Sequence, residues 1–183
     1  MKKAISILLA LTLLLFCAAA YAETAENTAE KTEIVTLRNA FTLKCGLPEG
    51  YALDVKTRTE ESVYAELTSA DAAKPKILIS IVYNDLYADI ERMNDIPEED
   101  LALYEALFSI MDDVKIEYKE TGYGTKIMMV TETFEDTSFI DFYTIYKGFE
   151  VEFVMTPGSE AISDANIQMM MDFITDLDFV PVE

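Results

Sequence analysis

The stretch GTKIMMVTETFEDTSFIDFYTIYKGFEVEFVMTP, residues 124–157, decides the fold. It contains three runs of β-branched and aromatic residues, separated by the dipeptides Glu135-Asp136 and Lys147-Gly148. Such runs favour strands, and strands joined by two residues turn back on each other as antiparallel hairpins. A similar run, VKIEYKE at 114–120, lies just before them. The stretch therefore predicts an antiparallel strand meander.

The short loops also predict how the strands of the meander are aligned. The last loop places Tyr143 opposite Glu152, and the loop before it places Asp141 opposite Val130. Because successive side chains of a strand point to opposite faces, this register assigns every other residue to a face. One face is apolar and is predicted to pack against a helix layer. It carries Ile127, Met129, Ile140, Phe142, Tyr146, Phe149, Val151 and Phe153.

The opposite face mixes acids with apolar side chains and is the candidate interaction face. In this register Asp141, Glu150 and Glu152 cluster, and such carboxylates could hold a Ca²⁺ ion or act as an acid–base pair. The alternative is a partly solvated face on which the carboxylates only keep the sheet soluble. A shift of one residue in either hairpin would exchange the two faces. The candidate face carries Glu132, Asp141, Tyr143, Glu150 and Glu152 among Met128, Val130, Ile145 and Val154.

Further strands are predicted before the meander. FTLKC at 41–45 and SVYAELTS at 62–69 alternate between apolar and polar residues, which is typical of strands with one buried face. KILISIVYN at 76–84 is almost continuously apolar, which is typical of a central strand covered on both faces. LPEG at 47–50 predicts a turn between strands.

Three segments have the pattern of helices. In DLYADIERM, residues 85–93, apolar side chains recur at i, i+4 and i+7. A second helix begins near Pro97, and its first turn is rich in acids, which the positive end of a helix dipole favours. Ser163 is a good N-cap for a third helix with an apolar stripe. LDFV at 177–180 then predicts a short terminal strand.

The order of these elements, with the opening F-x-L…LPEGY at 41–51 and the closing DFITDLDF at 172–179, resembles the PsbP/Mog-like superfamily over residues 36–181. Its members include extrinsic photosystem proteins, Ran-binding proteins of the Mog type and bacterial envelope proteins of the DcrB type. The resemblance implies an α+β fold in which an antiparallel twisted β-sheet has helices on both faces, an α/β/α sandwich. It also implies a non-enzymatic binding or scaffolding role, although fold alone does not establish function. No functional residue of the superfamily can be placed on this chain.

Residues 1–22 have the pattern of a secretory signal peptide. Two lysines precede an apolar run, and Ala20 and Ala22 are the small residues that precede a signal-peptidase cut. Cleavage after Ala22 predicts a secreted, periplasmic or cell-envelope protein. A lipid anchor at Cys17 is disfavoured because the bulky Phe16 stands where a lipobox has a small residue. No second apolar run is long enough to span a membrane.

After the cut, the chain is predicted to form one domain behind a short leader. Residues 23–33 are polar, acidic and low in complexity, which is typical of a flexible segment. Residues 34–183 have the length of a single α+β domain. Cys45 is the only cysteine in this part, so an internal disulfide is excluded. Its place in an alternating run predicts a buried apolar residue.

The composition excludes several classes of function. The net charge is −20, and removal of two lysines with the signal peptide makes it −20 − 2 = −22. Such a charge repels phosphates, which argues against binding to nucleic acids or anionic membranes. The chain has no histidine, so it cannot form a Ser-His-Asp or Cys-His catalytic pair, and it lacks the usual zinc ligands. No motif indicates a cofactor.

We therefore expect a non-enzymatic binding or scaffold protein whose partner is another protein or a small ligand. The alternative is a carboxylate-based hydrolase or a Ca²⁺-binding protein that uses Asp141, Glu150 and Glu152.

Overall fold

The computed structural model describes residues 32–35, 38, 40–108, 114–121, 124–134 and 137–182. They belong to one compact unit, Thr32–Glu183. The predicted signal peptide, its cleavage site after Ala22 and Cys17 lie outside the described residues. The first strand begins at Thr32, two residues before the predicted start of the domain.

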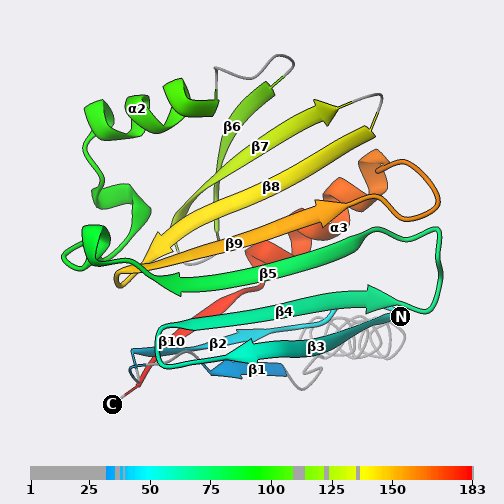
Figure 1. Cartoon of the computed structure of the whole chain (residues 1–183), viewed down its shortest axis with the longest axis horizontal. Coiled ribbons are helices and arrows are strands. Elements are labelled where there is room, and N and C mark those ends of the chain that lie inside the picture. The colour runs from blue at the N-terminus through cyan, green and yellow to red at the C-terminus, as the bar shows by residue number, and fades with distance from the viewer. Residues whose placement is uncertain are drawn as a thin grey trace, which may run out of the picture. The chain divides into compact units, whose positions relative to one another are not determined.

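The larger of two sheets contains seven strands, and every neighbouring pair is antiparallel (Figure 1). The prediction of the meander is confirmed, including its register: Tyr143 lies opposite Glu152, and Asp141 lies opposite Val130. Lys147 and Gly148 have φ angles of 50° and 77°, as expected for a two-residue hairpin loop of type I′. In spatial order the strands are β3 (Tyr51–Arg58), β4 (Ser62–Ser69), β5 (Lys76–Tyr83), β9 (Phe149–Thr156), β8 (Thr137–Tyr146), β7 (Lys126–Phe134) and β6 (Val114–Glu120).

The smaller sheet joins the two ends of the described chain. Its strands are β1 (Thr32–Val35), β2 (Phe41–Cys45) and β10 (Asp178–Pro181), in the order β1-β2-β10. Phe41 is fully buried and meets Phe149 of the large sheet edge-on, with ring centroids 5.3 Å apart. Cys45 is also fully buried, as predicted. The small sheet therefore packs on the large sheet through an apolar core.

Helix α3 (Asp164–Thr175) shares this core and lies behind β5 and β9 in Figure 1. Phe173 of α3 meets Phe153 of β9 edge-on at 5.7 Å between ring centroids. The apolar face that the sequence predicted is thus covered, but by a helix together with a second sheet.

The predicted α/β/α sandwich is wrong. The described residues form ten strands and only two α-helices, and the strands divide into sheets of seven and three. Two strands that the sequence predicts, at 41–45 and at the C-terminal end, form a separate covering sheet and do not extend the main one. They do so because their apolar side chains, Phe41, Leu43 and Phe179, all point into the same core.

The helix predicted at 85–93 is also wrong. Residues 85–95 instead contain two short 3₁₀-helices, η2 (Asp85–Tyr87) and η3 (Met93–Asp95). The side chain of Asn84 accepts a hydrogen bond from the Leu86 backbone N–H, 3.0 Å away, which closes a tight turn. Leu86 is 84% exposed, and only Tyr87, Ile90 and Met93 pack against a second apolar cluster, so the predicted apolar stripe is not buried as a whole.

The second face of the large sheet is covered over only part of its width. Helix α2 (Glu98–Phe108) buries Leu101 in this second apolar cluster with Met128, Val130 and Ile145, which lie on β7 and β8. Over β4 and β5 the side chains of Tyr64 and Leu78 are 44% and 36% exposed. The prediction that β5 is covered on both faces is therefore wrong. No helix of the described residues is long and apolar enough to cross a bilayer.

The N-terminus of α3 is closed by the predicted cap. The Asn166 backbone N–H donates to the Ser163 hydroxyl at 3.3 Å, and the Ser163 N–H donates to the Asn166 side-chain oxygen at 2.9 Å. Ser163→Ala is expected to lower the free energy of unfolding by about 1 kcal/mol. Urea denaturation measures this loss, with the exposed Ser159→Ala as the matched control. Equal stability of the two variants would contradict the capping role.

Candidate functional site

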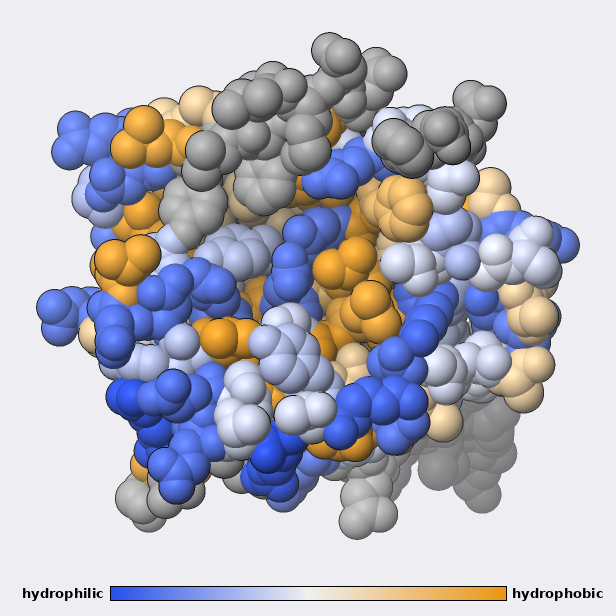
Figure 2. Space-filling model, viewed as in Figure 1, coloured by the Kyte–Doolittle hydropathy of each residue, from blue (hydrophilic) through white to orange (hydrophobic). Residues whose placement is uncertain are grey.

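The uncovered part of the large sheet, which we call the open face, is the candidate site. Figure 2 shows this side of the molecule, with apolar groups at its centre and polar groups around them. A shallow hollow of about 290 Å³ lies over β4, β5 and β9. The open face consists of the outward side chains of four strands: Lys56, Tyr64, Glu66, Lys76, Leu78, Ser80, Glu152 and Val154.

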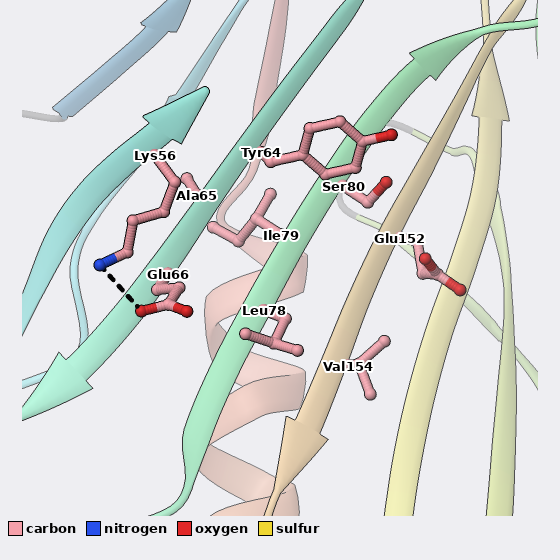
Figure 3. Close-up of a pocket in the computed structure, with 9 residues that line it drawn as sticks. All are labelled: Lys56, Tyr64, Ala65, Glu66, Leu78, Ile79, Ser80, Glu152 and Val154. Carbon is pink, nitrogen blue, oxygen red and sulfur yellow. Dashed lines mark ion pairs between the residues drawn. The ribbon is translucent and has the colours of Figure 1, made fainter. Parts of the chain in front are cut away.

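Two cross-strand rows build the open face. Tyr64, Ser80 and Glu152 form the first row, because β4, β5 and β9 pair at these positions. Glu66, Leu78 and Val154 form the second row, in register beside the first. Figure 3 shows these side chains on the same side of the sheet. Apolar side chains thus stand in the middle of an exposed sheet face, where alternation normally places polar ones.

Two lysines flank one carboxylate at the edge of the open face. The Glu66 carboxylate lies 2.7 Å from Lys76 Nζ and 3.1 Å from Lys56 Nζ (Figure 3 shows the second pair). The hydrogen bonds from Lys76 and then Lys56 lower the pKa of Glu66. Lys56 also pairs with Asp54, and that hydrogen bond is the main reason that its pKa is raised. These pairs hold the lysines in place at this edge.

A carboxyl pair stands at the opposite edge of the open face. Asp141 of β8 lies opposite Val154, one row from Glu152 of β9. Burial raises the pKa of Asp141 to about 8, and the charge of Glu152, a hydrogen bond to Glu152 and the charge of Glu132 add to the effect. Asp141 Oδ1 is buried and has no hydrogen-bond partner among the described residues. At neutral pH Asp141 is therefore mainly protonated beside its neighbour.

Of the other predicted residues, Glu132 and Tyr143 lie near this pair and Glu150 is held apart from it; the charge of Glu132 reaches Asp141. Asn84 Nδ2 donates to Glu150 Oε1 at 2.7 Å, which holds Glu150 beside the turn that leads to η2. Tyr143 lies directly opposite Glu152, as predicted, and also packs against the apolar cluster beneath α2. Among the residues that the structure describes, no three His, Cys, Asp or Glu side chains are arranged to hold a metal ion. The geometry gives an acid pair and no three-ligand cation site in this region.

Sequence reasoning missed the central residues of the open face. Tyr64, Leu78 and Ser80 belong to β4 and β5, whose loop is longer than two residues and predicts no register. The alternation of SVYAELTS does place Tyr64 and Glu66 on one side, opposite the buried Val63 and Ala65. This alternation predicts which side chains of β4 point outward, but it does not predict that the outward side remains uncovered.

Two comparisons with known proteins found no match. No model of a protein family matches the chain, and no curated protein matches it.

Proposed function

We propose that the protein is a secreted or cell-envelope binding protein without catalytic activity, which holds a partner protein on the open face. The observation that carries this proposal is the uncovered apolar centre of the open face, which consists of Tyr64, Leu78 and Val154. The opposite face of the sheet and the part beneath α2 are both packed against apolar clusters. Protein interfaces combine an apolar, often aromatic centre with a polar rim. Membership of the PsbP/Mog-like superfamily stays a prediction, and the proposal does not depend on it.

A protein fits the open face better than a small molecule does. The hollow of about 290 Å³ is wide open, whereas small-molecule sites are usually enclosed and larger. The rim also carries charges of both signs: Lys56 and Lys76 on one side, Glu152 on the other. We expect the partner to present acidic groups to the lysines, basic groups to Glu152 and an apolar group between them.

A titration of the native partner tests the proposal. The mature protein, immobilised, recovers the partner from the envelope or medium of the organism that makes it, and the purified partner is then titrated by calorimetry. The double variant Tyr64→Ser/Leu78→Ser should weaken binding at least about tenfold, because it removes the apolar centre. The matched control, Leu86→Ser/Leu103→Ser, changes two exposed leucines elsewhere. Equal binding by wild type and the Tyr64/Leu78 variant would contradict the proposal.

A carboxylate-based hydrolase is the second candidate, because a protonated acid stands beside a second carboxyl group. Asp141, with a pKa of about 8, could act as general acid, and Glu152, which lines the hollow, as base or nucleophile. A screen of glycoside and ester substrates decides between the candidates. Turnover that is lost in both Asp141→Asn and Glu152→Gln would replace the binding proposal. Calorimetry with Ca²⁺ tests the ion-binding alternative, since binding to the folded state alone must also raise Tm.

A further inference from the structure

A second hollow lies away from the open face, where η2 and the start of α2 meet. Its volume is about 460 Å³. Leu86 and Leu103 are 84% and 65% exposed, the highest values for large apolar side chains in the part of the chain that the structure describes. We call this hollow the α2 groove. Its apolar lining consists of Leu86, Tyr87, Ile90, Ile96, Pro97 and Leu103.

The rim of the α2 groove is strongly acidic. Residues 85–105 contain eight aspartates and glutamates and one basic residue, Arg92; from other segments, Lys147 Nζ lies 4.0 Å from the Glu91 carboxylate, and Arg38 lies near Asp85. Asp85, Asp89, Glu98 and Glu99 are exposed next to the lining residues, and Asp100 belongs to the lining itself. An apolar floor with acids on its edges attracts a ligand that has an apolar side and positive charges beside it.

We propose that the α2 groove binds a basic amphipathic helix of another protein. Apolar side chains of that helix, at i, i+3 or i+4 and i+7, would contact Leu86 and Leu103, and its lysines or arginines would face the acidic rim. A second copy of this chain does not fit, because it brings the same acidic groove and a net charge of −20. An anionic membrane surface is repelled for the same reason. This site is independent of the open face.

Two labelled peptides of about four helical turns test the proposal by fluorescence anisotropy with the mature protein. Both carry the same stripe of leucines; one has lysine and the other glutamate at the flanking positions. The lysine peptide should bind one to one, at least about tenfold more tightly than the glutamate peptide. Its binding should weaken as salt is raised, because salt screens the charges on the rim.

Variants of the groove locate the binding. The substitutions Leu86→Ser/Leu103→Ser should raise the Kd of the lysine peptide at least about tenfold. Asp89→Asn/Asp100→Asn should also raise this Kd and should make it less dependent on salt. Tyr64→Ser/Leu78→Ser is the matched control and should bind as wild type does, which separates this test from that of the open face. All four leucine and aspartate positions are exposed, so the variants should keep the wild-type Tm.

Three results would overturn the proposal. The first is equal binding of the lysine peptide to wild type and to the Leu86/Leu103 variant. The second is equal binding of the two peptides. The third is that the wild type forms a dimer at the working concentration and the Leu86/Leu103 variant does not, which would identify a second copy of the chain as the occupant of the α2 groove.

Discussion

Asp141→Asn is expected to remove a large pH dependence of stability and to make the protein more stable than wild type at pH 9. Burial, together with Glu152, raises the pKa of Asp141 to about 8 in the folded state, whereas an unfolded aspartate titrates near pH 4. Between these values the folded protein holds the extra proton, so its free energy of unfolding falls as pH rises. The contribution is fully present below about pH 4 and is lost by about pH 8.

The expected size follows from the shift. Each pH unit by which folding raises the pKa corresponds to about 1.4 kcal/mol of free energy of unfolding, and relaxation around a buried group reduces this amount. We therefore expect the difference in free energy of unfolding between variant and wild type to change by about 3–5 kcal/mol from pH 4 to pH 9. Urea denaturation at several pH values measures it. Glu160→Gln, at an exposed position on the loop after β9, is the matched control and should follow wild type. A parallel pH profile of Asp141→Asn and wild type would show that Asp141 is not buried as described.

Phe41→Ala is expected to lower the free energy of unfolding by about 4 kcal/mol, the range for a large aromatic side chain removed from a core. Phe41 is fully buried, and its ring meets Tyr146 at 5.1 Å and Phe149 at 5.3 Å between centroids, both edge-on. These contacts connect β2 of the small sheet to β8 and β9 of the large one. The substitution therefore removes both the burial and the aromatic pairs that join the sheets.

Urea denaturation of Phe41→Ala tests this connection between the two sheets. Val182→Ala, beyond the end of β10, is the matched control, because its side chain is 42% exposed and should change stability by less than about 0.5 kcal/mol. A loss for Phe41→Ala that is no larger than the loss for the control would contradict the packing of the small sheet on the large one.

The meander was predictable because its constraints are local. The loop Lys147-Gly148 leaves a single way to align β8 with β9, and the alternation of apolar residues then assigns the two faces. The prediction that Asp141 and Glu152 are neighbours followed from this register without knowledge of any distant contact.

The rest of the fold depends on contacts between distant segments. Phe41 of β2 lies opposite Pro181 of β10, at the other end of the described chain, and no local pattern shows that these strands form their own sheet. Residues 85–93 have helical spacing, but Leu86 of that spacing remains exposed, and helical spacing alone does not hold a short helix. The sequence does not predict the open face, because this face exists only where α2 does not cover the sheet.

Photo-crosslinking in the organism that makes the protein tests whether a partner protein binds on the open face. A photoreactive phenylalanine analogue replaces Tyr64 in one strain and the exposed Glu160 in another. We expect one covalent adduct with a specific protein from position 64 and none with that protein from position 160. An adduct with the same protein from position 160, and none from position 64, would show that the partner binds elsewhere.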